Sequence, residues 1–384
     1  MGKDYSKTNV SVVLPLILAI LLVIVLLFST YMMVQINNSI VKLKEAKRPA
    51  IVMLMGITAE GCSDCYDIDA VISKLENMNL NITSKDTIDW KNENAKELIQ
   101  KYNIKKVPTL LVLGEIEKSS ALTSAWSSYG EKVQDALVVT KQEPIYLDTA
   151  TGKEVGRISA VYLTAEACNE CIDRSTFVDS LKQSSIRFEE IKNVDVGTPE
   201  GLALADKYNI SFAPTYVFSS DLGVYSIIQQ NWDSVGNIET DGSYVLRYRA
   251  VPYYDLKEMK VRGLVSLIYL SDKSCKTCYN VSIHKQIFSN PAGFAMKIAN
   301  ESSYDISDAA GQALISKYSI VNVPTIIMQG DQAQYASLIN VWPQVGTVEA
   351  DGSYVFRNLD LLRATYKNLS SGKIINSSIP APAP

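Results

Sequence analysis

The sequence predicts an α/β protein in which three copies of one domain follow an N-terminal transmembrane helix. Three observations predict this class. A Cys-x-x-Cys (CxxC) motif occurs three times and uses all six cysteines, a Pro-Thr pair follows each motif at a nearly constant distance, and a tryptophan follows each such proline at one fixed distance. Spacings kept in three successive copies indicate an internal repeat. The chain of 384 residues is long enough for three domains of ordinary size.

The N-terminal segment has the composition of a membrane span. From Ser11 to Val34 it carries no charged residue, which is long enough to cross a bilayer. A cleaved signal peptide would have a shorter apolar core that ends in small residues, whereas Tyr31-Met32-Met33 follows here. We therefore expect an uncleaved signal anchor over residues 1–35 and a stalk over residues 36–49.

The sidedness of the anchor rests on opposing signals. Two lysines precede the span and four cationic residues follow it, so the positive-inside rule alone would place the bulk of the chain in the cytoplasm. Paired cysteines and the seven Asn-x-Ser/Thr tripeptides that follow the span favour the opposite side, although a chain rich in Asn and Ser also contains such tripeptides by chance. We expect a single-pass cell-membrane protein with an extracytoplasmic bulk. The glycosylation candidates are Asn37, Asn81, Asn209, Asn280, Asn300, Asn368 and Asn376.

Composition excludes two function classes. The formal net charge is −4 and no basic cluster stands out, so no nucleic-acid partner is expected. The chain has one histidine, which is too little imidazole for most catalytic metal sites, and we expect no metal and no cofactor.

Each copy predicts the same order of elements. In the first copy an apolar strand over 51–55 leads into the cysteine motif, and a helix over 67–75 follows. A second strand over 80–82, a second helix over 94–102 and a strand over 109–113 complete the series. The first cysteine is thus expected where a strand passes into a helix N-terminus. The repeat gives domains at 50–150, 151–258 and 259–367, and a tail over 368–384 without periodicity that is predicted to be disordered.

Aromatic, glycine and aspartate positions recur as well. We interpret the repeated tryptophans and tyrosines as core residues, since packing within one repeated fold explains them. These residues are Trp126, Trp232, Trp342, Tyr102, Tyr208 and Tyr318, and the repeated glycines and aspartates are Gly130, Gly236, Gly346, Asp135, Asp241 and Asp351.

The order strand, CxxC, helix, strand, helix and Pro-Thr strand resembles the thioredoxin-like superfamily, three times over, in an arrangement similar to that of protein disulfide isomerases. The resemblance covers residues 50 to about 365. It implies that the proline of each Pro-Thr pair is cis and lies against the cysteine pair, where it and the preceding residue bind substrate. The positions are Val107, Pro108, Ala213, Pro214, Val323 and Pro324.

The resemblance also assigns roles to the cysteines. The first cysteine of each pair would attack a substrate disulfide and the second would resolve the mixed disulfide, closing a local bridge. The bridges would be Cys62–Cys65, Cys168–Cys171 and Cys275–Cys278. Backbone N–H groups at a helix N-terminus would stabilise the first thiolate. Asp64 and Glu170 should raise the pKa of the neighbouring thiol, and Lys276 should lower it.

The sequence departs from the thioredoxin pattern at two places. Gly61, Ala167 and Ser274 stand where thioredoxin has a tryptophan. Gly56, Tyr162 and Tyr269 stand where it has a buried acid that relays the resolving proton. These departures favour an oxidant, an isomerase, a slow relay or a structural module over a fast reductase.

Two function classes remain open. The first is a membrane-anchored thiol–disulfide oxidoreductase or isomerase that acts on protein thiols and disulfides of secreted or surface proteins. The second is a non-catalytic scaffold of disulfide-closed modules that self-associates or joins a membrane complex. Soft-metal capture by the cysteine pairs is a third interpretation of the motif, and His284, nine residues after Cys275, is expected on the surface. An exposed first sulfur beside a groove would favour the enzyme.

Overall fold

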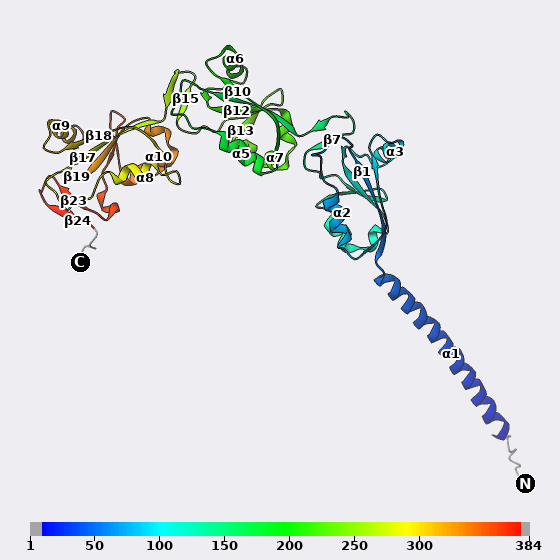
Figure 1. Ribbon diagram of the computed structural model, residues 1–384. Coiled ribbons are helices and arrows are strands. Elements are labelled where there is room, and N and C mark those ends of the chain that lie inside the picture. The colour runs from blue at the N-terminus through cyan, green and yellow to red at the C-terminus, as the bar shows by residue number, and fades with distance from the viewer. Residues whose placement is uncertain (1–9, 378–384) are drawn as a thin grey trace, which may run out of the picture. The chain divides into compact units, whose positions relative to one another are not determined.

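The computed structural model describes residues 10–377, with side chains from residue 15 onward (Figure 1). The chain divides into two compact units at Val155/Gly156. The first unit holds the N-terminal helix and the first repeat, and the second unit holds the other two repeats. The predicted α/β class is confirmed, with three sheet-plus-helix repeats after an apolar helix.

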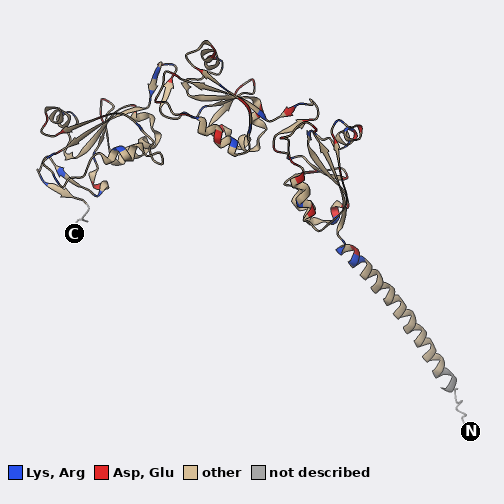
Figure 2. Ribbon diagram, viewed as in Figure 1, with Lys and Arg blue, Asp and Glu red and all other residues tan. Residues whose placement is uncertain are grey.

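Helix α1 spans Val10–Lys47 and is the one helix of the described chain that is long and apolar enough to cross a membrane. Figure 2 shows no charged residue along it until its C-terminal turns, where Lys42 is the first. The predicted stalk at 36–49 is therefore helical up to Lys47. Only two residues separate α1 from the first strand, which begins at Ala50.

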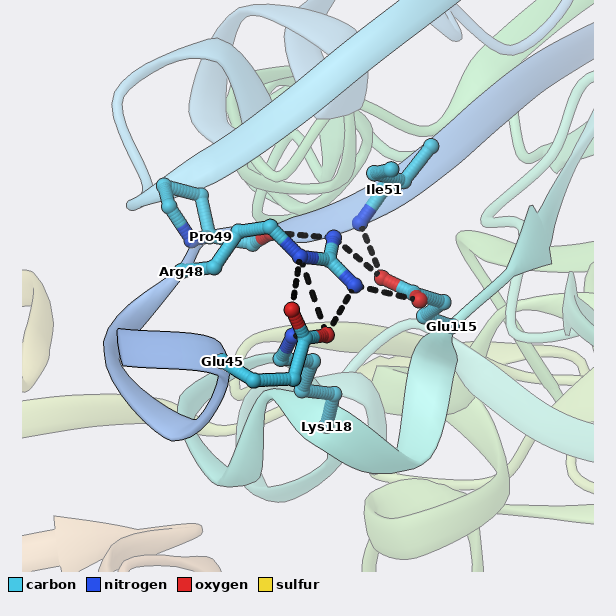
Figure 3. A network of polar contacts seen from close by, with 6 residues as sticks. All are labelled: Glu45, Arg48, Pro49, Ile51, Glu115 and Lys118. Carbon is cyan, nitrogen blue, oxygen red and sulfur yellow. Dashed lines mark hydrogen bonds and ion pairs between the residues drawn. The ribbon is translucent and has the colours of Figure 1, made fainter. Parts of the chain in front are cut away.

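A network of charged side chains closes the junction between α1 and the first repeat (Figure 3). Arg48 donates from both terminal nitrogens to Glu115, at 2.8 and 2.7 Å, and also pairs with Glu45, which Lys118 contacts at 2.7 Å. The Ile51 N–H donates to Glu115 at 2.9 Å. The Arg48 hydrogen bonds and this N–H lower the pKa of Glu115 to about 2. The junction is held by ion pairs on the protein surface.

The first repeat alternates strands and helices as the sequence predicts and adds short strands. Its elements are β1 (Ala50–Thr58), α2 (Asp69–Glu76), β2 (Leu80–Asp89), α3 (Glu93–Lys101), β3 (Lys106–Val107), β4 (Thr109–Gly114), α4 (Ser120–Trp126), β5 (Gly130–Val133), β6 (Ala136–Val139), β7 (Tyr146–Asp148) and β8 (Glu154–Val155).

The five long strands form one sheet in the order β2-β1-β4-β6-β5. β2 is parallel to β1 and the other pairs are antiparallel. Alternate side chains of β4 point to opposite faces: Leu110 packs with α2 and α4, whereas Leu111 packs with α3. A second sheet, β3-β7-β8, contains the residues just before the Pro-Thr pair.

The second and third repeats have the same two sheets, in the orders β10-β9-β12-β14-β13 with β11-β15-β16, and β18-β17-β20-β22-β21 with β19-β23-β24. The second repeat comprises β9 (Arg157–Thr164), α5 (Ser175–Gln183), β10 (Arg187–Asp195), α6 (Pro199–Lys207), β11 (Phe212–Ala213), β12 (Thr215–Phe218), α7 (Ser226–Asn231), β13 (Gly236–Ile238), β14 (Tyr244–Leu246), β15 (Tyr253–Asp255) and β16 (Lys260–Arg262). The third comprises β17 (Leu264–Ser271), α8 (Ile283–Ser289), β18 (Lys297–Asp305), α9 (Ala309–Tyr318), β19 (Asn322–Val323), β20 (Thr325–Gly330), α10 (Ala336–Val345), β21 (Gly346–Val348), β22 (Tyr354–Phe356), β23 (Thr365–Asn368) and β24 (Ile374–Asn376).

Three short strands lie outside the limits that the sequence suggested for their own domains. β8 follows residue 150 but pairs with β7 of the first repeat, and β16 likewise lies past residue 258 and pairs with β15. β24 lies in the tail predicted to be disordered and pairs with β23. Strands of two or three residues carry no readable periodicity, so the sequence did not reveal them. The rest of the tail, residues 378–384, lies outside the described residues.

The repeated residues have packing roles. The three tryptophans are buried, as predicted, and each donates its indole N–H to a main-chain carbonyl. The hydroxyl of each repeated tyrosine donates to the repeated aspartate, at 3.0, 2.9 and 2.9 Å. A Cβ on any of the three repeated glycines would overlap a carbonyl oxygen of the neighbouring strand, so only glycine fits at this strand end.

Candidate active site

Each cysteine pair lies in the loop that follows the first strand of its repeat, which is β1, β9 or β17. The three pairs are disulfide-bonded, Cys62–Cys65, Cys168–Cys171 and Cys275–Cys278. The N–H of each first cysteine donates to the carbonyl three residues earlier, at 3.1, 2.9 and 3.0 Å, which makes the approach a tight turn. The six predicted cysteines thus form three local sites.

The helix after each pair begins later than the sequence suggested. α2 starts at Asp69, four residues after Cys65, and the other two helices start four and five residues after their second cysteines. The cause is an aspartate or asparagine two residues after each pair, whose side chain accepts from a backbone N–H two residues on and so forms a turn. The residues are Asp67, Asp173 and Asn280. The expected position on the first helical turn is wrong, and the helix N-terminus does not stabilise the thiolates as we expected.

The prolines of the three Pro-Thr pairs are cis, as the resemblance implied. In the second repeat the Cys171 sulfur lies 4.0 Å from the carbonyl oxygen of Ala213, the residue before the proline. In the third repeat the Tyr279 hydroxyl, next to Cys278, donates to the Pro324 carbonyl at 3.0 Å. The cysteine loop and the cis-proline segment are therefore in contact in these two repeats.

The predicted substrate-binding residues are covered by the chain itself. Val107, Ala213 and Val323 are fully buried, and each pairs with a strand of its own repeat. Their ladder partners are Leu147 on β7, Tyr254 on β15 and Lys367 on β23. The N–H of the residue after the second cysteine donates to a carbonyl at the start of this covering strand. The bonds run from Tyr66 to Ile145 at 2.8 Å, from Ile172 to Pro252 at 3.0 Å and from Tyr279 to Thr365 at 2.9 Å. The strand thus links the cis-proline segment to the cysteine loop.

Access to the first sulfur differs between the repeats. Cys62 and Cys65 are half-buried, whereas Cys168 and Cys275 are 8% and 9% exposed. Ile172, next to Cys171, lines a cavity of about 380 Å³ together with Val251 and Phe294. The first pair has the most exposed attacking cysteine, and the second pair has an adjacent cavity.

Charges around the pairs are partly compensated. Glu170, predicted to raise the thiol pKa in the second repeat, forms an ion pair with Lys297 at 2.6 Å. Asp272, three residues before Cys275, is buried and pairs with Lys367 at 2.5 Å. Burial raises the pKa of Asp272, but the Lys367 and Ser274 hydrogen bonds outweigh it, and the net pKa is lowered. The third pair thus lies beside a carboxylate that stays ionised, besides the exposed Lys276.

His284 is buried, and its predicted surface position is wrong. It is 2% exposed, its Nε2 lies 3.2 Å from the Tyr279 hydroxyl, and its ring packs against Phe288 and Phe356. Burial lowers its pKa from 6.5 to about 4, so the ring is neutral at pH 7. Val71 and Phe177 occupy the corresponding core positions of the first two repeats, nine residues after the first cysteine, and this correspondence could have revealed the burial from the sequence.

Two further features of the sites escaped the sequence analysis. An aspartate ends the second strand of every repeat, at one fixed distance before the cis proline, and binds the cysteine loop: Asp89, Asp195 and Asp305. Its constant spacing was an available signal. Trp90, the one tryptophan outside the repeated set, packs in one cluster with Cys62 and Cys65.

Six of the seven glycosylation candidates are exposed, and Asn368 is half-buried. The Asn368 amide donates to Asn322 at 2.9 Å and its carbonyl accepts from the Ser371 N–H at 2.8 Å. Its side chain is therefore engaged within the third repeat.

Known proteins offer distant structural similarities. No protein-family model and no curated protein matches the chain. Among solved structures, the N-terminal domain of alkylhydroperoxide reductase AhpF from Enterococcus faecalis is 16% identical, with coverage of 45% of this chain and 84% of that chain and a TM-score of 0.16. ERdj5 form II is 10% identical over 77% of this chain and 39% of that chain, with a TM-score of 0.13. The zinc-bound form of human ERp44 is 14% identical over 74% and 82%, with a TM-score of 0.14.

The fold of each repeat is thioredoxin-like. A CxxC loop after the first strand, a parallel β-α-β half, and an antiparallel strand opened by a cis proline are present three times. At the identities and TM-scores above, the function of this chain has to be inferred from its own residues.

Proposed function

We propose that this protein is a membrane-anchored thiol–disulfide oxidoreductase or isomerase whose domains lie outside the cytoplasm and act on secreted or surface proteins. The observation that carries the proposal is the first site, where a CxxC disulfide in the loop after β1 keeps both cysteines partly exposed. The exposed sequons and the three disulfides support the extracytoplasmic side. Interaction with further membrane proteins or with copies of itself belongs to the same proposal.

The chemistry is exchange between disulfides. A substrate thiolate attacks Cys62 of the oxidised pair, a mixed disulfide forms, and Cys65 leaves as a thiolate. A second substrate thiolate then attacks the substrate sulfur of the mixed disulfide and releases Cys62. The substrate gains one disulfide and the site becomes a dithiol, which needs an external disulfide such as oxidised glutathione to turn over. Isomerisation begins instead from the dithiol, with Cys62 attacking a substrate disulfide, and consumes no oxidant.

Insulin reduction and the refolding of scrambled ribonuclease test the proposal with the full chain in detergent. We expect activity in a glutathione buffer, and a loss of most of it in the double variant Cys62→Ser with Cys65→Ser. The corresponding double variant of the third pair is the matched control and should retain more activity, because Cys275 is less exposed. Wild-type chain that neither reduces insulin nor refolds ribonuclease would contradict the proposal.

A scaffold of disulfide-closed modules is the second candidate, and the covering strands favour it. A substrate that adds as a strand needs free backbone groups beside the cis proline, but β7, β15 and β23 already pair there. A scaffold predicts that none of the three pairs exchanges with glutathione. An oxidoreductase predicts exchange at the first pair, whose cysteines are half-buried although β7 covers the cis-proline segment, and at the other two pairs only if the covering strand opens.

A further inference from the structure

A carboxylate is fixed against every cysteine loop by the backbone. Oδ2 of Asp89 accepts from the Glu60 N–H at 2.7 Å, and Oδ1 accepts from the Lys91 N–H at 2.9 Å. The second repeat has the same pair of bonds from Asp195, at 2.5 and 2.7 Å, and the third has it from Asp305, at 2.5 and 3.0 Å. Each Oδ2 thus binds the residue two positions before the first cysteine.

The carboxylate fixes the short segment that leads to the first cysteine. The Cys62 N–H donates to the Ala59 carbonyl at 3.1 Å, so the residues between Ala59 and Cys62 are held by the turn on one side and by Asp89 on the other. The second and third repeats keep this arrangement. A rotation of the loop that moved the first sulfur would break one of these bonds.

Apolar packing of its two sequence neighbours also fixes the position of the aspartate. Its neighbours Ile88 and Trp90 lie in the same apolar cluster as Cys62 and Cys65. In the second repeat Val194 and Val196, on either side of Asp195, lie in the cluster that contains both cysteines. In these two repeats, therefore, the cysteines pack in the same apolar cluster as the strand end that carries the carboxylate.

The charge is not neutralised by an ion pair. Within the described residues, none of these three carboxylates has a lysine or arginine nitrogen within 4.0 Å, in contrast to Asp272, which pairs with Lys367. A negative charge next to a cysteine disfavours the thiolate, whereas a disulfide is neutral and is not affected by the charge. The carboxylate therefore acts on the reduced form of the site.

We propose that Asp89, Asp195 and Asp305 are positioning residues of the three redox sites: each holds the loop ahead of the first cysteine and fixes a negative charge at the residue two positions before it, which disfavours the thiolate of the reduced site and so favours the disulfide. This inference rests on the proposed function and adds the residue that sets how readily each pair is reduced. Reduction by two glutathione thiols gives the dithiol and one glutathione disulfide. At a pH at which the first cysteine of the reduced pair is a thiolate, removing the charge shifts this equilibrium toward the reduced pair.

Asp89→Asn in the full chain in detergent tests the proposal, with Asp86→Asn as the matched control. Asp86 lies on the same strand β2, is exposed, and does not contact the loop through its side chain. Two quantities are measured for Cys62: the thiol pKa, from the pH profile of alkylation after reduction with a phosphine, and the fraction reduced in a fixed glutathione buffer. We expect Asp89→Asn to lower the Cys62 pKa by about 1 unit and, in a glutathione buffer at a pH above that pKa, to raise the fraction reduced. The other two pairs and Asp86→Asn should stay at wild-type values.

A merely structural role gives a different result. Asparagine keeps one acceptor but loses the second, so Asp89→Asn lowers thermal stability in either case. Lower stability with an unchanged Cys62 pKa would overturn the proposal. If Asp89→Asn does not fold, Asp195→Asn gives the same test on Cys168. The alkylation profile can be measured even if no pair exchanges with glutathione. A shifted Cys62 pKa in a chain whose pairs never exchange would therefore refute the proposed function but support the electrostatic role of the aspartate.

Discussion

The third repeat should lose stability in acid because of His284, and replacing this residue by phenylalanine should remove that loss. The ring is 2% exposed, and the 190 Å³ cavity beside it is lined by apolar side chains such as Ile287, Leu338 and Val341. No carboxylate lies among the lining residues that would compensate a charge on the ring. Phenylalanine is the conservative choice because Phe177 fills the same position of the second repeat.

The magnitude follows from the two pKa values of the histidine. In the unfolded chain it titrates near 6.5 and in the folded chain at about 4, so as the pH falls the unfolded state binds the proton first. The stability that the neutral ring contributes is complete above pH 6.5 and is lost progressively down to about pH 4. Because each pKa unit corresponds to about 1.4 kcal/mol, the loss is about 2 kcal/mol at pH 5 and about 3 kcal/mol at pH 4.

Hydrogen exchange of β17 amides in the full chain, read by mass spectrometry, measures the free energy of opening of the third repeat. We compare wild type with His284→Phe at pH 7.5, 5 and 4, and use β9 amides of the second repeat as an internal control. The free energy of opening measured at the β17 amides should fall by about 2 kcal/mol more in the wild type than in His284→Phe between pH 7.5 and pH 5. If both proteins lose β17 protection in parallel, the histidine is not the cause, and the tight burial of a neutral ring is refuted.

Mass mapping without reduction should find bridges only within each CxxC motif, and a bridge between two motifs would contradict the repeat organisation. After reduction the thiol pKa should be lowest at Cys275, because Lys276 favours its thiolate, whereas alkylation above all three pKa values should be fastest at Cys62, the more exposed sulfur. If the cysteine with the lowest pKa were also the one alkylated fastest as a thiolate, this prediction would be refuted. Protease added to intact cells should digest the domains, and Asn368 should carry no glycan; digestion only after the membrane is opened would place the domains in the cytoplasm. Arg48→Gln should speed tryptic cleavage at the end of α1, since Glu115 loses its partner, and unchanged cleavage would show that these ion pairs do not hold the junction.

The sequence by itself determined the repeat and the order of the long elements, and the resemblance of its motifs to the thioredoxin-like superfamily implied the local pairing of the cysteines and the cis prolines. These features depend on residues close in the chain or on spacings kept in three copies, and a CxxC pair can close a bridge whatever surrounds it. The apolar composition of α1 needs no tertiary information either.

Only the tertiary structure decided whether those motifs form open sites. β7 covers the residue before Pro108 although the two are distant in the sequence, and a strand of three residues has no pattern that announces a partner. His284 is buried by Phe356, which is also distant in the sequence, because burial depends on what packs against a helix rather than on the residue type.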